Sequence, residues 1–386
     1  MSNGALKGAL AVAVAGVIGL GYMYNNAQQQ SAAALEQAKA AAESAAATAA
    51  ADAGLPELNW RLQSAVPPGI GFYMGGVYFA EEVEKMTNGK FKIRVFPAGE
   101  IVGTMQIFDA VSDGTVEAGH TASYYYYGKN PAFALDTTIP FGLNYRQFQA
   151  WYNFGGGGEM IKDLFAQSNI VPFPAGNTGV QMGGWYNKEV NSLADLDGLK
   201  MRIGGMGGKI IEKLGVVPQS IPGGDIFPSL EKGTIDAAEW VGPFDDMKMG
   251  FNKVAEYYYT PGWWEAAPNL SVYINKEKFD SLPVEYQNII EAAAERANVK
   301  TTAFYDAKNP EALKTILAGG TKMKIFPKDV MDAAWDAAQE TYAELEAENE
   351  DFKRIYGSMK AFQKDQNQWM SVSEGPLDSY MQRKMR

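Results

Sequence analysis

Short alternating segments and longer amphipathic segments follow one another along most of the chain. Apolar and polar residues alternate over residues 60–65 and again over residues 91–96, which predicts a β-strand in each segment. Between them, residues 69–86 have the spacing of a helix with one apolar face. Strands interleaved with helices are typical of the α/β class.

A short motif occurs twice in the chain. In residues 108–118 a Phe is followed by Gly-Thr and then by Ala, and residues 227–237 repeat this spacing. Each copy predicts a helix that ends on Gly and leads through Thr into a strand. Alternating segments at residues 90–95 and 199–203 precede the two copies, so the whole unit predicts two similar α/β lobes.

Helical segments follow the second lobe. Residues 283–306 have helical apolar spacing, with Pro283 near the start. Residues 329–356 form a further helical block that is acidic on one side and apolar on the other. Helices at this place can cross between two lobes or cap one of them, and two lobes that close on a ligand hold it at their seam.

The N-terminal residues differ in composition from the rest. Lys7 precedes an uncharged run at residues 8–24, so residues 1–26 are predicted to be a signal peptide or an uncleaved membrane anchor. Residues 27–56 are rich in Ala and predict a helical tether. Both interpretations place the body outside the cytoplasm; a cytosolic protein with an unusual N-terminal helix is the third alternative.

Composition excludes several kinds of function. The 386 residues carry a net charge of −11, and an acidic body repels phosphate, so we expect no nucleic-acid partner. The chain has no Cys, which excludes disulfides and thiolate metal sites. His120 is the single histidine, which argues against histidine-based acid–base chemistry.

Five stretches occur in an order and spacing shared with a known family. They are residues 118–128 (AGHTASYYYYG), 139–144 (IPFGLN), 196–202 (LDGLKMR), 239–243 (EWVGP) and 257–265 (YYYTPGWWE). Together they resemble the substrate-binding subunits of tripartite ATP-independent periplasmic (TRAP) transporters, in the branch that binds 2-oxo acids and lactate. The similarity extends from about Trp60 to the C-terminus.

The resemblance implies a fold and a place of action. The fold is two-lobed α/β, like other periplasmic binding proteins, with a ligand cleft between the lobes and long C-terminal helices. We expect lobe I to comprise residues 57–179 and 268–305, and lobe II residues 180–267 and 306–386. The activity implied is that of a non-catalytic periplasmic receptor that delivers a carboxylate to membrane permease subunits.

Arg202 lies on the predicted strand at residues 199–203. From the alternation alone it would face outward, because Met201 and Ile203 would face the core. The resemblance implies instead that Arg202 pairs with the substrate carboxylate, a task that suits a planar guanidinium group.

The resemblance also implies a metal site. Its ligands would be the Glu239 carboxylate, the Trp240 main-chain carbonyl and the Gln181 side chain, all oxygen donors of the kind that Na⁺ or Ca²⁺ requires. Without the resemblance, Glu239 would be an ordinary solvated carboxylate and Gln181 a polar strand residue. Because Arg202 and Glu239 cancel in charge, Na⁺ with a monocarboxylate leaves the site neutral, so we predict Na⁺, with Ca²⁺ as the alternative.

Aromatic residues supply two further candidates. Tyr126, which we place beyond a strand end, could donate to the ligand, although most residues of the tyrosine runs at 124–127 and 257–259 are expected to pack on strands. Phe72 could cover an aliphatic tail; its other interpretation is a core residue at a helix start. We expect Trp264 and Glu265 to border the cleft.

The sequence therefore predicts a receptor that binds a small 2-oxo or 2-hydroxy monocarboxylate together with a cation. Two alternatives stay open, a metal-dependent 2-oxo acid lyase or aldolase and a membrane-tethered carboxylate sensor. Residues 360–370 offer apolar side chains either for a homodimer or for packing on their own lobe.

Overall fold

The computed structural model describes residues 54–385, together with positions 26, 29–30, 33–34, 36–37 and 39. The chain divides into two units, Met1–Glu57 and Leu58–Arg386, and the account below concerns the second. The predicted signal peptide or anchor and most of the predicted tether lie outside the described residues. Within the described part of the chain, no helix combines the length and the apolar character needed to cross a bilayer.

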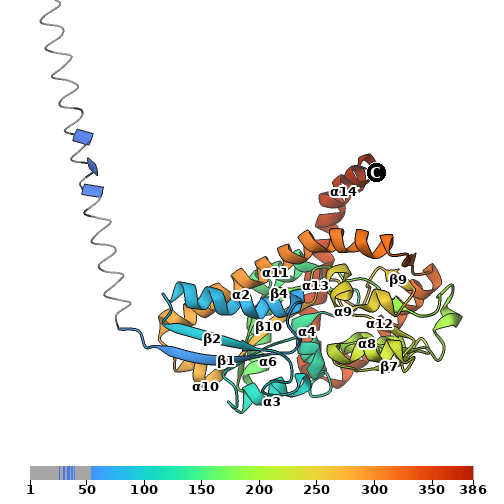
Figure 1. Ribbon diagram of the computed structural model, residues 1–386, viewed down its shortest axis with the longest axis horizontal. Coiled ribbons are helices and arrows are strands. Elements are labelled where there is room, and N and C mark those ends of the chain that lie inside the picture. The colour runs from blue at the N-terminus through green and yellow to red at the C-terminus, as the bar shows by residue number, and fades with distance from the viewer. Residues whose placement is uncertain are drawn as a thin grey trace, which may run out of the picture. The chain divides into compact units, whose positions relative to one another are not determined.

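Two separate β-sheets organise the second unit (Figure 1). The first has the strand order β2-β1-β3-β10-β4, in which β1 is parallel to β2 and β3, while β10 is antiparallel to β3 and β4. Its strands are β1 (Leu58–Ser64), β2 (Phe91–Phe96), β3 (Ala118–Thr121), β4 (Ile170–Asn177) and β10 (Asn269–Asn275).

The second sheet has the order β11-β9-β5-β8-β6-β7. Its strands are β5 (Trp185–Tyr186), β6 (Lys200–Arg202), β7 (Val217–Gln219), β8 (Ala237–Ala238), β9 (Tyr257–Thr260) and β11 (Lys322–Ile325). Every strand of each sheet falls within the residue ranges expected for one lobe, and the α/β class with two sheets is confirmed. The division of the remaining residues between lobes stays a prediction.

The repeated motif has the structure expected of it. Helices α3 (Ile107–Ser112) and α8 (Gly223–Glu231) are followed by Gly114 and Gly233, whose φ angles are +79° and +66°. Glycine adopts this left-handed conformation without the strain that a Cβ atom would bring. The chain then enters β3 in the first copy and β8 in the second. The predicted helix at 69–86 is confirmed as α2 (Gly71–Met86).

Long helices cover the sheets. Helix α11 (Val284–Ala318) runs beside α2 and β4 (Figure 1). The block predicted at 329–356 is two helices, α12 (Lys328–Glu348) and α13 (Glu350–Val372), because the Asn349 side chain accepts a hydrogen bond from Phe352 N (2.8 Å) and starts a new helix. Helix α13 packs against α5 (Tyr145–Phe154) and α6 (Gly157–Ala166).

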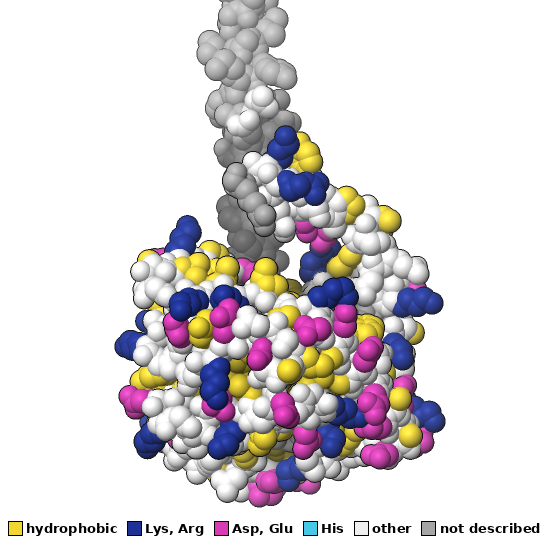
Figure 2. All heavy atoms as spheres, turned by 90° about the vertical axis from the view of Figure 1, so that its right-hand side faces the viewer, with side chains coloured by type: hydrophobic (Ala, Val, Ile, Leu, Met, Phe, Trp, Pro, Cys, Tyr) yellow, Lys and Arg dark blue, Asp and Glu magenta, His cyan; other side chains and the backbone are white. Residues whose placement is uncertain are grey.

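The remaining helices are shorter. They are α4 (Ala134–Thr137), α7 (Gly205–Glu212), α9 (Pro243–Met249), α10 (Lys276–Asp280) and the C-terminal α14 (Glu374–Lys384). Figure 2 shows one face of the molecule, on which acidic and basic side chains are interspersed with hydrophobic ones instead of gathering in a patch of one sign.

Candidate functional site

Arg202 and Glu239 meet at the ends of two adjacent strands. Arg202 is the last residue of β6 and Glu239 follows β8, and these strands pair in parallel, so their carboxyl ends lie side by side. Both residues are buried. Arg202 Nη1 donates to the Glu239 main-chain oxygen (3.0 Å) and to its carboxylate, and Nε donates to the oxygen of Ile221 (3.1 Å). The interpretation of Arg202 as an outward-facing residue is therefore wrong.

The Glu239 carboxylate is only half satisfied. Its Oε1 accepts from Arg202 and from Gly204 N (2.8 Å), whereas Oε2 is buried without a hydrogen-bond partner. Burial raises the pKa of Glu239, while the charge of Arg202 and the Gly204 N–H oppose the increase. Glu239 is thus not the solvated strand-end carboxylate that the sequence alone suggests.

Glu265 is a second buried carboxylate beside this pair. Neither of its oxygens has a hydrogen-bond partner. Burial raises its pKa well above the usual range and the nearby charge of Glu239 raises it further, while the charge of Arg202 and the adjacent Tyr124 and Gln181 side chains oppose the increase. Sequence reasoning placed Glu265 at the border of the cleft but did not count it as a metal ligand. The available signal was its position, a carboxylate directly after two tryptophans.

Gln181 joins the same group. Its Nε2 donates to Thr178 Oγ1 (3.3 Å), and its Oε1 is buried without a partner. The main chain holds it beside Glu265, because Gln181 N donates to the Glu265 oxygen (3.3 Å) and Gly262 N donates to the Gln181 oxygen (3.2 Å).

Together, Glu239, Glu265 and Gln181 present four buried oxygens that lack partners. Unpartnered buried acceptors are costly unless something positive or a donor meets them. Two carboxylates and an amide oxygen are the donor set that a hard cation prefers, so these residues fit a bound metal ion. No group of three or more His, Cys, Asp or Glu side chains able to hold a metal occurs in the described residues, and here the amide of Gln181 completes the set.

Trp240 supports the arginine. The Arg202 guanidinium lies 5.0 Å from the centre of its ring, a cation–π contact that orients the planar group. Gly223 makes room for the ring, since a Cβ atom there would lie 2.5 Å from Trp240 Cη2. The role of the Trp240 carbonyl as a metal ligand stays a prediction.

The tyrosine run at 124–127 is not a strand. Residues Ser123–Tyr126 form a 3₁₀ helix, which changes the side-chain period from two residues to three. Tyr126 consequently lies in the core, where its hydroxyl donates to the Thr104 oxygen (3.2 Å) and lies 3.1 Å from Thr121 Oγ1.

Tyr124 and Tyr125 lie closer to the charged cluster. The charges of Glu239 and Glu265 raise the pKa of both phenols, after burial as the main cause, and the pKa of Tyr125 reaches about 12. The Tyr124 ring rests on Gly204, where a Cβ atom would lie 2.9 Å from Tyr124 Cε2.

Phe72 lies in the first turn of α2, buried, with its ring edge-on to His120 at 5.5 Å. Burial lowers the pKa of His120 to about 3, so this imidazole is neutral at physiological pH. A histidine held in one protonation state is poorly suited to acid–base chemistry.

A hollow of about 310 Å³ opens next to the cluster. Its lining comes from the tyrosine turn on one side and from the start of α7 on the other, and includes Tyr124, Tyr125, Ile203, Gly205 and Lys209. The side chains of Arg202, Glu239, Glu265 and Gln181 do not line this hollow, although Ile203, which does, directly follows Arg202.

Comparison with known proteins finds a matching family and a similar relative. Residues 66–349 match the family described as bacterial extracellular solute-binding protein, family 7. A monocarboxylate 2-oxoacid-binding periplasmic protein of Nostoc sp. is 47% identical over 86% of this chain and 91% of its own length.

Two crystal structures share the fold. One is a TRAP transporter solute binding protein from Bordetella bronchiseptica, a mixed-occupancy dimer with copurified calcium and picolinate; it is 50% identical, with a TM-score of 0.84 over 86% of this chain and 98% of that one. The other, from Pseudoalteromonas atlantica, contains sodium and pyruvate and is 38% identical, with a TM-score of 0.81 over 84% and 99%.

Proposed function

Because this chain belongs to family 7 of the bacterial extracellular solute-binding proteins, the receptors of TRAP transporters, we propose that it captures a small 2-oxo or 2-hydroxy monocarboxylate together with a cation. The observation that carries the proposal is the group of unpartnered oxygens of Glu239, Glu265 and Gln181 beside the buried guanidinium of Arg202. The protein is a binding protein and not an enzyme.

We assign different parts of the ligand and the cation to different residues. Arg202 binds the carboxylate, and Trp240 keeps its guanidinium in position. Glu239, Glu265, Gln181 and the Trp240 carbonyl hold the cation, which supplies the positive charge that the carboxylate and the adjacent 2-oxo or 2-hydroxy oxygen share. Phe72 covers the tail. The Tyr126 hydroxyl donates to the Thr104 oxygen, on the side of the molecule that contains the first sheet (the first-sheet half). We therefore assign the contacts with the ligand to Tyr124 and Tyr125 instead.

Counting the charges favours a divalent cation. A carboxylate that coordinates a metal is deprotonated, so in the metal-bound site Arg202 balances only one of the two charges of Glu239 and Glu265 and the protein contributes a net charge of −1. A monocarboxylate adds another, and Ca²⁺ brings the sum to zero, whereas Na⁺ leaves one buried negative charge. The earlier preference for Na⁺ omitted Glu265. We therefore propose Ca²⁺, the ion in the Bordetella relative, as the preferred partner over the Na⁺ of the Pseudoalteromonas one.

The two rival functions differ in what they require. A lyase or aldolase needs a group that moves protons, and the single histidine is buried and neutral, which is consistent with the family of receptors. A sensor would use the same site and differ in its partner. We propose the periplasm as the location and TRAP membrane permease subunits as the partners.

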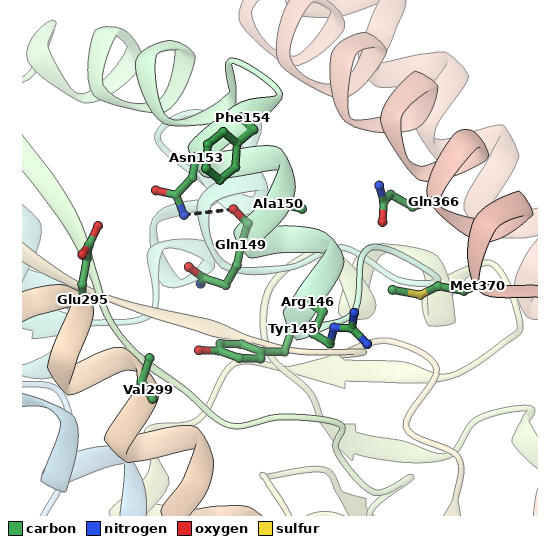
Figure 3. A pocket seen from close by; sticks show the side chains of 10 residues that line it. All are labelled: Tyr145, Arg146, Gln149, Ala150, Asn153, Phe154, Glu295, Val299, Gln366 and Met370. Atoms are coloured by element: carbon green, nitrogen blue, oxygen red, sulfur yellow. Dashed lines mark hydrogen bonds between the residues drawn. The ribbon is translucent and has the colours of Figure 1, made fainter. Parts of the chain in front are cut away.

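We also propose a homodimer through the C-terminal helices. Helix α13 is held against α5, since Gln147 Nε2 donates to Asn367 Oδ1 (2.8 Å), yet Trp369 stays 59% exposed. Helix α14 buries no residue within the described chain. A groove of about 690 Å³ is lined by residues of α5, α11 and α13. Figure 3 shows Tyr145 and Phe154 of α5, Val299 of α11 and Met370 of α13 around it.

The oligomeric state is measurable by sedimentation velocity. We expect a dimer for the protein without residues 1–57 and a monomer after removal of residues 373–386, which contribute no buried side chain to the described fold. A monomer in both cases would contradict the dimer.

Isothermal calorimetry tests the proposed function. The protein is titrated with pyruvate, lactate, longer 2-oxo acids and succinate, each in a choline buffer with chelator, with Na⁺ or with Ca²⁺. We expect tight binding of the monocarboxylates that requires the cation, with Ca²⁺ giving the higher affinity. The proposal would be overturned if the protein bound succinate but none of the monocarboxylates, or if neither Na⁺ nor Ca²⁺ changed the affinity.

A further inference from the structure

We propose that Asp245 is a positioning residue at the pivot of this protein: it joins helix α2 of the first-sheet half to the segment that carries Glu239 and Trp240, and the halves turn about this junction when the cleft opens. The inference rests on the proposed function for the ligand, but the geometry of the junction is independent of it.

Asp245 links three elements. It lies in α9, is fully buried, and accepts a hydrogen bond from Gly71 N on Oδ1 (2.7 Å) and from the Tyr305 hydroxyl on Oδ2 (2.7 Å). The residue that precedes α2, Ile70, has no side chain able to cap the helix. The carboxylate of Asp245 therefore caps α2 from a distant part of the chain and meets the positive end of its dipole.

The elements around Asp245 are closely packed. A Cβ atom at Gly71 would lie 2.5 Å from Tyr305 Cζ, so only glycine allows α2 to come this close. The preceding residue of α9, Phe244, donates its main-chain N–H to Asn309 Oδ1 (3.0 Å), and its ring packs edge-on against Phe304 at 5.0 Å. Helix α9 is thus held along α11 by polar and aromatic contacts together.

The two sides of the cleft differ in what opening would cost. Separating α9 from α2 would take the Gly71 N–H away from the buried Asp245 carboxylate and leave Oδ1 without this donor, which is costly. On the other side, Tyr124 packs on Gly204, and the Tyr124 and Tyr125 hydroxyls interact with Glu265 and Arg202; water can replace these polar partners when this side opens, and it also reaches the unpartnered oxygens of Glu239 and Glu265. We infer that the Tyr124 side separates and the Asp245 side stays closed.

Only five residues lie between Glu239 and Asp245 along the chain. Because this short segment joins the cation ligands to the pivot, a shift of α9 would move the Glu239 carboxylate relative to Phe72 in α2. Asp245 therefore acts on ligand affinity without touching the ligand.

Spin-label distances test the pivot, and the absence of Cys makes labelling specific. In one pair, cysteines replace exposed Lys129, which follows the tyrosine turn, and exposed Lys209 of α7. In the other pair, they replace exposed Lys248 of α9 and exposed Ala303 of α11, beside the Asp245 junction. With Ca²⁺ and pyruvate we expect the 129–209 distance to shorten and the 248–303 distance to stay unchanged. A change at 248–303 as large as that at 129–209 would overturn the pivot.

Variants make the test independent of ligand. In the unliganded protein, Asp245→Asn and Tyr305→Phe should broaden the 248–303 distance distribution, and both should weaken pyruvate binding by about tenfold, the loss expected for one buried hydrogen bond. Asp225→Asn, at an exposed aspartate, is the control. A sharp 248–303 distribution in both variants contradicts the pivot. Absence of binding by the unaltered protein would instead count against the proposed function.

Discussion

Arg202 bonds twice to one residue, Glu239: Nη1 donates to the main-chain oxygen at 3.0 Å and also to the side-chain carboxylate. The guanidinium is therefore oriented before any ligand arrives, and Glu239 Oε2 is left without a partner. A buried pair of this kind gains little stability, because desolvation offsets most of the attraction. Its value lies in presenting a positive and a negative group side by side to a ligand and a cation.

Arg202→Lys should weaken all carboxylate ligands. Lysine keeps the charge but lacks the planar fork and the stacking on Trp240, so we expect a loss of about 1.5–3 kcal/mol, roughly ten- to a hundredfold in dissociation constant. The dependence on the cation should persist. Calorimetry with pyruvate measures both, with the exposed Arg94→Lys as control; affinity equal to that of the control would remove Arg202 from the carboxylate site.

Glu239→Gln should weaken the dependence of binding on the cation. Glutamine keeps the size and one oxygen but loses the charge, and weak binding through Arg202 should remain. The measurement is a pyruvate titration with and without Ca²⁺ and Na⁺. An unchanged response to both ions would show that Glu239 is not a metal ligand.

Much of the architecture was predictable because its signals are local. The repeat that ends on Gly114 and Gly233 depends on φ angles that only glycine adopts easily, so it is visible in the sequence. The break at Asn349 was missed, since a single capping side chain interrupts an otherwise helical pattern. The burial of Arg202 was not visible either, because alternation on a three-residue strand does not show that its second face is covered.

The site was harder to predict than the fold. Resemblance identified Arg202, Glu239 and Gln181, which the structure brings together. It did not place Glu265 in this group, because the closeness of Glu265 to Glu239 arises from tertiary folding and not from a local sequence pattern. Tyr126 does lie beyond the end of β3, but in the 3₁₀ turn its hydroxyl hydrogen-bonds to the Thr104 oxygen, which is why we propose its neighbours as ligand contacts.

Glu265→Gln should change which cation is preferred. Removing one of two carboxylates makes Na⁺ the ion that leaves the site neutral with a monocarboxylate, so we expect the ratio of affinities in Ca²⁺ and in Na⁺ to fall at least tenfold. Glu231→Gln, at an exposed glutamate, should leave the ratio unchanged. If Glu265→Gln keeps the preference for Ca²⁺, Glu265 does not contribute its charge to the site.

Asp246 should make stability depend on pH. Burial raises its pKa from 3.8 to about 7, against the opposing hydrogen bonds from Tyr258, Trp185 and Val241 N. An acid with a higher pKa in the folded state binds its proton more tightly there, so its contribution is fully present below 3.8 and is lost as the pH rises through about 7.

Asp246→Asn should therefore flatten part of the pH profile. Between about pH 5 and pH 7.5 we expect the free energy of unfolding of the unaltered protein to fall by about 2 kcal/mol more than that of the variant. Urea unfolding of both proteins at several pH values measures this difference. The contributions of titrating groups that are the same in both proteins cancel when the two profiles are subtracted. Parallel profiles for the variant and the unaltered protein would contradict the assignment.

Gly204→Ala should impair closure without destabilising the open protein. Gly204 has a φ of −86°, which any residue adopts, so alanine brings no backbone strain. Its Cβ atom would, however, lie 2.9 Å from Tyr124 Cε2, and this conflict exists only when the tyrosine turn and the start of α7 are in contact. We expect pyruvate affinity to fall about tenfold, a cost of about 1.4 kcal/mol, while the melting temperature without ligand stays within the range of the control.

That control is Gly224→Ala, at a glycine with nothing within 4 Å of an added Cβ atom. Unchanged affinity in Gly204→Ala would mean that the ligand-bound protein does not bring Tyr124 and Gly204 together, and an equal loss of stability with and without ligand would mean that the contact persists when the cleft is open.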